Sequence, residues 1–223
     1  MKEGTRLYIN ITNKCNTNCP FCCMYSGSNK NNFMNFNTFK HIIDNCKDKF
    51  ELQLEGGEPT IHKELYLFIE YAISTGRCTK IILLTNGIEL DKHMHRILNI
   101  ANWYKINVEI KVSVNYWLLD KDENSLEKLN KLIFATKYIE NLDIKLNVRK
   151  RKEDDWIDQE LKDFGLYDYS NIFYLQSYGK LSKSDEYDKP VIVQNIANWE
   201  VYASDGENFG QDLIARSEYE KGL

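Results

Sequence analysis

The regular alternation of strand-like and helix-like segments between residues 7 and 176 limits the fold of this chain more than any other feature. Six segments rich in Ile, Val, Leu and Tyr predict β-strands, at Leu7–Thr12, Glu51–Glu55, Lys80–Thr85, Ile106–Asn115, Leu142–Arg149 and Ile172–Gln176. Five segments between them have helical spacing, at about 37–49, 63–75, 90–102, 124–140 and 153–164. Five strand–helix units followed by a sixth strand imply right-handed crossovers and a parallel sheet, either open or curved into a partial barrel.

The strands themselves favour the curved form. Strands that are buried on both faces are almost continuously apolar, whereas these strands alternate. In the fourth strand one face carries Asn107, Glu109, Lys111, Ser113 and Asn115. The apolar faces can cover the helices, so the polar faces meet on the inside, where they need water or a polar ligand because unpaired buried polar groups are costly. We therefore predict an α/β fold: a partial (β/α)6 TIM-like barrel of parallel strands with a polar interior.

The 223 residues are enough for one domain with a sizeable core. We assign residues 1–178 to the partial barrel and residues 179–223 to a short C-terminal extension that caps it. The segment Trp199–Ala203 in this extension looks like a strand. No cysteine follows Cys78, so the extension offers no thiol ligand to a metal.

Composition and charge limit the partners and the cellular location that we expect for this protein. A formal net charge of −4 argues against a general nucleic-acid binder, which needs a basic face. The sequence has no apolar run approaching the roughly 18–20 residues of a membrane span, and its first residues lack the apolar stretch of a signal peptide. We therefore predict a cytoplasmic protein without membrane partners, in which thiols stay reduced and clustered cysteines indicate metal binding or catalysis. Four of the six cysteines lie between positions 15 and 23.

The functional face of a βα barrel lies at the C-terminal ends of its strands. The unusual residues of this sequence follow the predicted strands at that face. In chain order they are the cysteine motif Cys15–Cys22, then Gly56–Pro59, Thr85–Gly87, Ser113–Asn115 and Asn147–Arg149. Random scatter would not collect these segments on one rim.

The cysteine motif spaces Cys15, Cys19 and Cys22 by three and two intervening residues. Thiolates are soft ligands that suit iron–sulfur clusters or zinc, and this spacing lets one short loop wrap around a cubane. A saturated 4Fe-4S cluster takes four cysteines, so three leave one iron open to another ligand. The alternative is a zinc site that includes Cys23, but zinc leaves Gly56–Pro59 unexplained.

The segment Cys15-Asn16-Thr17-Asn18-Cys19-Pro20-Phe21-Cys22 resembles the cysteine motif of the radical S-adenosylmethionine (SAM) superfamily. The lead-in Ile9–Lys14 resembles the first strand of that family, and Gly56–Pro59 resembles its second motif. The similarity extends over roughly Leu7 to Gln176. It implies one 4Fe-4S cluster and SAM as cofactors, with SAM chelating the open iron. It also implies that reductive cleavage of SAM gives a 5′-deoxyadenosyl radical, which abstracts hydrogen from a substrate.

The resemblance also implies roles for single residues. Cys15, Cys19 and Cys22 would ligate three irons. The backbone of Gly56, Gly57 and Glu58 would accept hydrogen bonds from the methionine amino group, with the glycines permitting close approach. Phe21 would shield the cluster and flank the adenine, although a core aromatic would look the same.

Four further cofactor-binding candidates lie after the third, fourth and fifth strands: Asn86, Ser113, Asn115 and Arg149. Ser113 and Asn115 resemble positions that contact the carboxylate and ribose of the cofactor. Arg149 could pair with the carboxylate through its planar guanidinium. The alternatives stay open: these polar side chains could bind substrate, and Asn86 could merely form a turn with Gly87.

The catalytic residue is not fixed by the resemblance. Glu109, Lys111 and Lys145 are expected to point inward from the fourth and fifth strands, where they would bind a polar substrate or form a structural ion pair. Cys23 could offer a thiol to the pocket, or be an inert neighbour of the cluster.

We expect the substrate to be a peptide handled without auxiliary clusters, or a small metabolite. A glycyl-radical-enzyme activator is one alternative, and a non-catalytic iron–sulfur or zinc scaffold is another. The family similarity implies an electron donor such as ferredoxin or flavodoxin.

Overall fold

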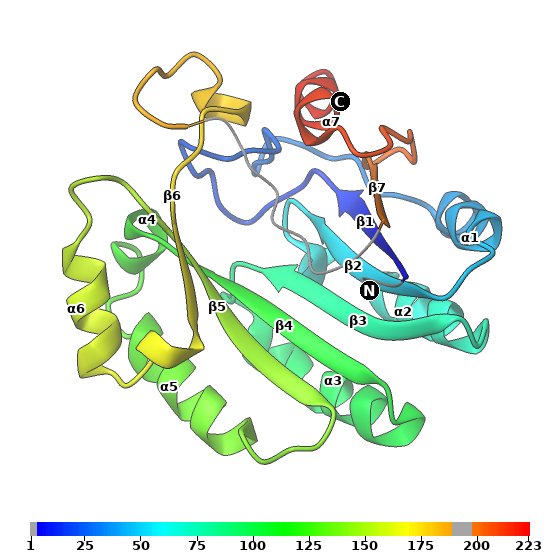
Figure 1. Cartoon of the computed structure of the whole chain (residues 1–223), viewed down its shortest axis with the longest axis horizontal. Helices are drawn as coiled ribbons and strands as arrows, with labels where there is room; N and C mark the ends of the chain where they lie inside the picture. The colour runs from blue at the N-terminus through cyan, green and yellow to red at the C-terminus, as the bar shows by residue number, and fades with distance from the viewer. Residues whose placement is uncertain (1–3, 189–197) are drawn as a thin grey trace. The chain divides into compact units, whose positions relative to one another are not determined.

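The computed structural model describes residues 4–188 and 198–223, so that part of the predicted C-terminal extension, residues 189–197, lies outside the described residues. Seven strands form one sheet in the order β6-β5-β4-β3-β2-β1-β7 (Figure 1). They are β1 (Thr5–Thr12), β2 (Phe50–Gly56), β3 (Cys78–Thr85), β4 (Asn107–Val114), β5 (Leu142–Lys150), β6 (Ser170–Tyr174) and β7 (Asn198–Tyr202). The α/β class and the parallel strands are confirmed. The six predicted strands are present, and a seventh joins them at the segment that looked like a strand in the extension.

All five predicted helices are present. They are α1 (Phe36–Asn45), α2 (Leu65–Ser74), α3 (Leu90–Tyr104), α5 (Ser125–Thr136) and α6 (Trp156–Asp163). Two were not predicted, α4 (Tyr116–Leu119) and α7 (Leu213–Glu220), and three short 3-10 turns are added at Pro59–Ile61, Tyr167–Tyr169 and Gly179–Leu181. Among the described residues, no helix has both the length and the apolar character needed to cross a membrane.

The chain divides into two compact units. The first, which we call the N/C unit, comprises residues 1–84 and 176–223, and the second, the middle unit, comprises residues 85–175. Our assignment of residues 1–178 and 179–223 to a barrel and a cap stays a prediction.

In the N/C unit, β1 pairs in parallel with β2 on one side and with β7 on the other. The register places Asn10 beside Glu55. The apolar residues of β1 and β2 are fully buried, and α1 and α2 join the same core through Phe39 and Phe68, whose rings stack with centroids 4.3 Å apart. The helix α1 starts at an N-cap, Asn35, whose side chain accepts a hydrogen bond from the backbone N–H of Thr38.

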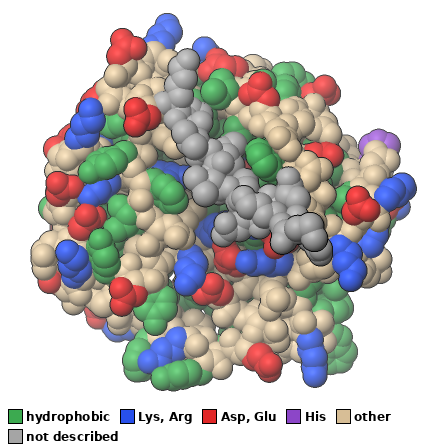
Figure 2. Space-filling model, viewed as in Figure 1, with side chains coloured by type: hydrophobic (Ala, Val, Ile, Leu, Met, Phe, Trp, Pro, Cys, Tyr) green, Lys and Arg blue, Asp and Glu red, His purple; other side chains and the backbone are tan. Residues whose placement is uncertain are grey.

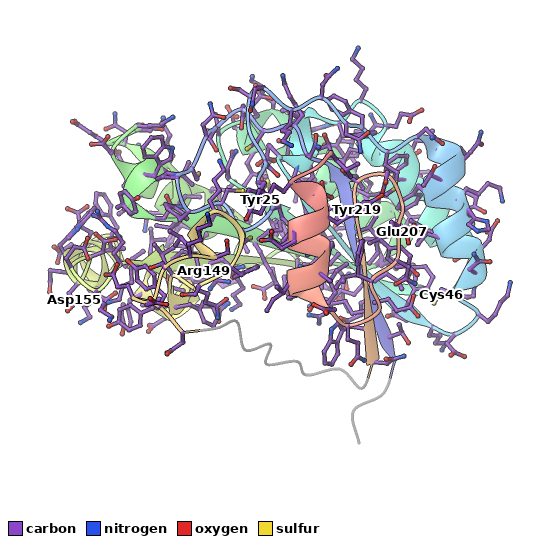
Figure 3. All side chains as sticks on the ribbon, turned by 90° about the horizontal axis from the view of Figure 1, so that it is seen from above. Tyr25, Cys46, Arg149, Asp155, Glu207 and Tyr219 are labelled. Atoms are coloured by element: carbon purple, nitrogen blue, oxygen red, sulfur yellow. The ribbon has the colours of Figure 1, made fainter. Side chains whose placement is uncertain are left out.

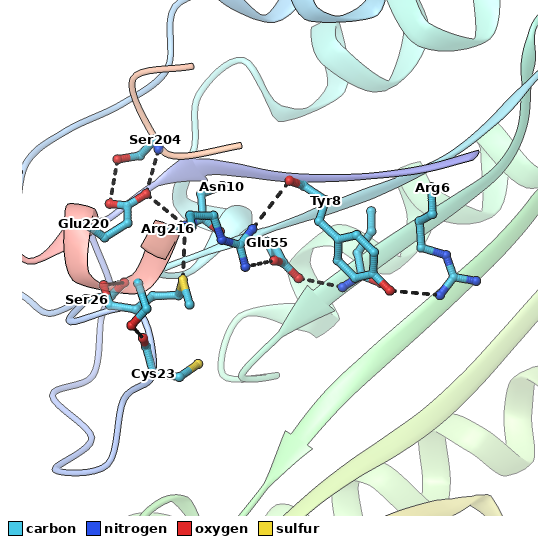
Figure 4. A network of polar contacts seen from close by, with 12 residues as sticks. Arg6, Tyr8, Asn10, Cys23, Ser26, Glu55, Ser204, Arg216 and Glu220 are labelled. Atoms are coloured by element: carbon cyan, nitrogen blue, oxygen red, sulfur yellow. Dashed lines mark hydrogen bonds and ion pairs between the residues drawn. The ribbon is translucent and has the colours of Figure 1, made fainter. Parts of the chain in front are cut away.

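The polar face of β1 and β2 is covered by α7. The guanidinium of Arg216 lies 2.7 Å from the carboxylate of Glu55, and both residues are buried. The carboxylate of Glu220 accepts hydrogen bonds from Asn10 and from the backbone and hydroxyl of Ser204 (Figure 4). On β1 and β2, the C-terminal helix α7 therefore supplies hydrogen-bond and ion-pair partners that we had expected from water or a polar ligand.

In the middle unit, β4 and β5 pair in parallel with Lys111 beside Lys145. The apolar residues of both strands are buried, together with side chains of the helices: Val108, Ile110, Val112, Val114, Ile144, Leu146, Val148, Ile97, Ile133 and Leu161. Figure 1 shows α3, α5 and α6 flanking these strands. Since successive side chains of a strand point to opposite faces, Glu109, Lys111 and Lys145 lie on the face away from that buried row.

Charges of both signs are interspersed on the face of the molecule that Figure 2 shows. The described residues on that face therefore form no broad positive area of the kind that nucleic-acid binding requires.

We predict that Arg216→Met destabilises the protein by about 3–5 kcal/mol, because it leaves the buried Glu55 carboxylate without its cation. Adding Glu55→Met should recover part of this loss, because the double variant leaves neither charge unpaired. Urea denaturation followed by circular dichroism measures the free energies of unfolding.

Lys131→Met is the matched control. Its ion pair with Glu127 is exposed on both sides, so its loss should cost less than about 0.5 kcal/mol. Equal losses in Arg216→Met and Lys131→Met would contradict a structural role for the buried pair.

Candidate functional site

The predicted cluster ligands lie on a loop that begins where β1 ends and closes back on its own start. The backbone N–H of Cys15 donates to the carbonyl of Gly27 at 3.1 Å, and the N–H of Gly27 donates to the carbonyl of Asn13 at 3.3 Å. Further along, the N–H of Met34 donates to the carbonyl of Ile11 in β1 at 2.8 Å. We call residues 13–27 the cysteine loop. All four clustered cysteines lie within this closed loop.

The sulfur atoms share a polar neighbour within this loop. The hydroxyl of Thr17 lies 3.4 Å from the sulfur of Cys15 and 3.4 Å from that of Cys19, and Cys15 and Thr17 are both buried. The backbone N–H of Cys22 donates to the carbonyl of Cys19 at 3.3 Å. All six cysteines of the chain are free thiols. Within residues 4–188 and 198–223, no three His, Cys, Asp or Glu side chains gather at a site that could hold a single metal ion.

Electrostatics at Cys22 favour the neutral thiol. Burial raises the pKa of the Cys22 thiol, the adjacent Cys23 raises it further, and Lys180 opposes the shift. A metal ligand must be deprotonated, so binding a cluster through Cys22 would release a proton.

The glycine-rich segment packs directly onto the start of the cysteine loop. The N–H of Gly57 donates to the carbonyl of Thr12 at 2.7 Å, and the N–H of Glu58 donates to the carbonyl of Lys14 at 2.9 Å. A Cβ at Gly56 would lie 2.2 Å from the Thr12 oxygen, and one at Gly57 would lie 2.0 Å from the Lys14 oxygen. These two positions thus require glycine because the segment lies close to the backbone of Thr12 and Lys14, where the cysteine loop starts. The expected close approach of the cofactor to the same glycines stays a prediction.

Gly57 also offers an acceptor. Its carbonyl has no hydrogen-bond partner among the described residues, so it is available to a donor such as an ammonium group. The carboxylate of Glu58 is fully buried and accepts hydrogen bonds from the N–H and hydroxyl of Thr60. The Glu58 side chain therefore shapes the turn at Pro59–Ile61.

Phe21 and Cys23 are half-buried on the cysteine loop. The carbonyl of Cys23 accepts a hydrogen bond from the hydroxyl of Ser217 in α7 (Figure 4). Cys23 is thus held by its backbone next to Cys22, and its thiol stays a candidate.

The other predicted residues belong to the middle unit. The side-chain oxygen of Asn86 accepts from the N–H of Ile88, which makes the turn that we had considered. Asn115 is buried and caps α4 by accepting from the N–H of Leu118 at 3.0 Å. Ser113 is half-buried on β4. Their predicted contacts with the cofactor stay predictions.

In this unit, Arg149 has a hydrogen-bond donor that the described residues do not use. Its guanidinium lies over the ring of Phe173, 4.4 Å from the ring centroid. One terminal nitrogen, Nη1, is buried and has no hydrogen-bond partner within residues 4–188 and 198–223. A buried charged donor left in this state suits an anionic or carbonyl oxygen of a ligand.

The three charged candidates are paired along their own strands. Lys111 Nζ lies 3.3 Å from a Glu109 oxygen, and both side chains are mostly buried. Lys145 Nζ lies 3.7 Å from a carboxylate oxygen of Asp143, a more exposed pair. Asp143 was missing from our candidates, although the two-residue period of β5 puts it on the same face as Lys145.

The model of the Radical SAM superfamily matches residues 9–135 of this chain, which is more than half of its length and includes the cysteine loop and the glycine-rich segment. The chain belongs to the radical SAM superfamily.

Several radical SAM proteins are similar to it. It is 32% identical over 85 residues to an S-adenosylmethionine-dependent nucleotide dehydratase of Selenomonas ruminantium, covering 37% of this chain and 30% of that protein. It is 26% identical over 116 residues to a GTP 3′,8-cyclase of Vibrio vulnificus, covering 49% and 33%. The crystal structure of Streptococcus suis SuiB bound to precursor peptide SuiA shares the fold, with a TM-score of 0.60 and 17% identity over 83% of this chain and 43% of that one. The chain spans less than half the length of these relatives.

Membership of the radical SAM superfamily implies a 4Fe-4S cluster, SAM, a reductant and a substrate. The donor set of the cysteine loop fits such a cluster, because it offers three soft thiolates on one closed loop. The partnerless carbonyl of Gly57, on the segment bonded to that loop, fits the amino group of SAM.

We predict that Gly57→Ala lowers cluster occupancy as well as SAM affinity, because the added Cβ would push Lys14 and the cysteine loop away. Overpacking against a fixed backbone costs about 1–3 kcal/mol. Iron and sulfide content after anaerobic reconstitution measures the occupancy, and equilibrium binding measures the SAM affinity.

Gly222→Ala serves as the control, because a Cβ there meets only one atom, at an ordinary contact distance of 3.5 Å. Full iron content in Gly57→Ala, with only the SAM affinity lowered, would show that the loop contact tolerates a side chain.

Proposed function

We propose that this radical SAM enzyme holds one 4Fe-4S cluster through Cys15, Cys19 and Cys22, reductively cleaves SAM, and abstracts hydrogen from a polar substrate, either a peptide or a small metabolite. The observation that carries the proposal is the cysteine loop, which is closed on itself and bonded through Lys14 to Glu58, while Gly57 bonds to Thr12 just before the loop. When bound and reduced, the cluster with SAM supplies a radical that removes a hydrogen atom.

The positions of several residues suit this chemistry. The three cysteines lie on one closed loop, where Cys15 is buried and Cys19 and Cys22 are half-buried. The Gly57 carbonyl would accept a hydrogen bond from the methionine amino group of SAM. An electron donor such as ferredoxin or flavodoxin supplies the electron, since a radical SAM enzyme needs a reductant.

The polar face of β4 and β5 supports a polar substrate. It carries two ion pairs, Glu109–Lys111 and Asp143–Lys145, and the buried Arg149 nitrogen that lacks a partner. A substrate with acceptor oxygens would satisfy Arg149 and could exchange with the longer of the two pairs. Proteins named for nucleotide and GTP chemistry among the relatives support a small metabolite, and the SuiB structure with its precursor peptide supports a peptide.

The test of the proposed function is formation of 5′-deoxyadenosine by the anaerobically reconstituted chain with a strong reductant and SAM, with and without cell-extract fractions. We expect slow formation without an extract and faster formation with the fraction that holds the substrate. A reconstituted chain that binds iron and yields no 5′-deoxyadenosine under any of these conditions would favour the scaffold alternative.

We predict about four irons and four sulfides per chain, the content of one cubane. Replacing Cys15, Cys19 or Cys22 by Ala should abolish the visible absorbance of the cluster, whereas Cys46→Ala and Cys78→Ala should keep it. Zinc bound in place of iron, or about eight irons per chain, would contradict the single cluster.

We predict that Glu109→Gln and Lys111→Met leave the slow 5′-deoxyadenosine formation unchanged and reduce its stimulation by the active fraction at least about tenfold, a loss of roughly 1.4 kcal/mol of transition-state stabilisation. Thermal denaturation of both variants supplies the control for folding. A large fall in melting temperature, with stimulation lost only in proportion to unfolding, would assign the pair a structural role.

A further inference from the structure

A segment from the distant C-terminal part of the chain is fastened to the cysteine loop. We call residues 177–182 the strap. The backbone at Gly179 has a φ of +64° and lies against Cys23 so closely that a Cβ at Gly179 would be 2.4 Å from the Cys23 Cα. Any larger residue would be strained there and would separate the strap from the loop.

Lys180 binds the loop at three carbonyls. Its backbone N–H donates to the carbonyl of Cys22 at 3.0 Å. Its ammonium group donates to the carbonyls of Cys19 at 3.1 Å and Ser26 at 3.3 Å. The side chain of Lys180 therefore joins the backbone of Cys19, a predicted cluster ligand, to Ser26 near the end of the loop. The backbone of Lys180 holds a second predicted ligand, Cys22.

Tyr25 ties the strap, the loop and α7 together. Its hydroxyl lies 2.7 Å from the Gly179 carbonyl and 2.9 Å from a carboxylate oxygen of Glu218 in α7. The ammonium of Lys221 lies over the Tyr25 ring, 5.4 Å from its centroid. Figure 3 shows Tyr25 beside α7. These contacts fix the strap, so the position of Lys180 follows from the fold of the N/C unit.

We propose that Lys180 is a positioning residue of the cluster, which holds Cys19 and Cys22 by their backbones and whose positive charge makes the cluster easier to reduce. The inference rests on the proposed cluster ligation by Cys15, Cys19 and Cys22. One-electron reduction adds a negative charge to the cluster, with the electron coming from the external reductant. A cation fixed against the loop stabilises the reduced form more than the oxidised form, because its attraction grows with that charge. Reduction potentials of iron–sulfur clusters respond to local charge in this way.

The experiment compares Lys180→Met, Lys180→Arg and the control Lys183→Met in the full chain after anaerobic reconstitution. Lys183 is exposed, lies just beyond the strap and has no partner among the described residues. The midpoint potential is measured by redox titration followed by electron paramagnetic resonance. We expect a more negative potential in Lys180→Met, and a potential near that of the wild type in Lys180→Arg and Lys183→Met.

The outcomes separate this inference from the proposed function. A wild-type chain that forms no 4Fe-4S cluster would overturn the proposed function itself. A wild-type cluster with the same potential in Lys180→Met as in Lys183→Met would overturn only the role of Lys180. If Lys180→Met cannot retain iron, Lys180→Arg decides: retained iron at the wild-type potential supports the inference, and loss of iron there too counts against a role for the positive charge.

Discussion

The hydrogen bonds from Gly57 and Glu58 to the carbonyls of Thr12 and Lys14 are the contact on which the candidate site depends. They join the end of β2 to the end of β1 at the point where the cysteine loop leaves the sheet. Here that contact excludes every side chain at two positions, since a Cβ would fall within 2.2 Å of a carbonyl oxygen at either glycine. The glycine-rich segment is therefore part of the wall of the cysteine loop.

The same loop is anchored from the other end of the chain. Lys180, Ser217 and Tyr25 connect it to the strap and to α7 through bonds that span more than 150 residues of sequence. Arg216 and Glu220 fix α7 in turn, because they pair with Glu55 and Asn10, buried polar residues of β2 and β1 whose burial is costly without partners. One helix, α7, thus covers the polar faces of β1 and β2 and also positions the cysteine loop.

Periodicity was sufficient to predict the strands and most of the helices, because each of these elements buries an apolar face against its neighbours. The spacing of Cys15, Cys19 and Cys22 and the Gly-Gly-Glu-Pro segment were sufficient to predict the family. The helix α7 was missed because its buried face is polar: Arg216, Ser217 and Glu220 read as solvent-exposed positions until their partners on β1, β2 and the cysteine loop are known. The role of Lys180 could not be predicted either, because no local pattern marks a lysine that binds carbonyls 154–161 residues away. The need for glycine at position 57 was predicted from the approach of the cofactor, which stays a prediction; the contact with the Lys14 carbonyl could not be predicted, because the sequence does not reveal which backbone lies opposite.

The polar strand faces of the two units differ in how firmly their charges are held. In the N/C unit, Arg216 and Glu55 are 2.7 Å apart with side chains 3% and 9% exposed, and Glu55 also accepts a hydrogen bond from Gln53. Removing either charge leaves the other in a medium that solvates it poorly, so this pair is suited to fixing structure. In the middle unit, Lys111 and Glu109 are 3.3 Å apart and 18% and 14% exposed, and Lys145 and Asp143 are farther apart and more exposed. A longer, wetter pair loses less when a ligand displaces one partner, because water and the ligand share the solvation of the released charge. This difference in cost is the physical reason for proposing that β4 and β5 bind the substrate while β1 and β2 give structural support. The Arg149 nitrogen that lacks a partner among the described residues supports the same proposal.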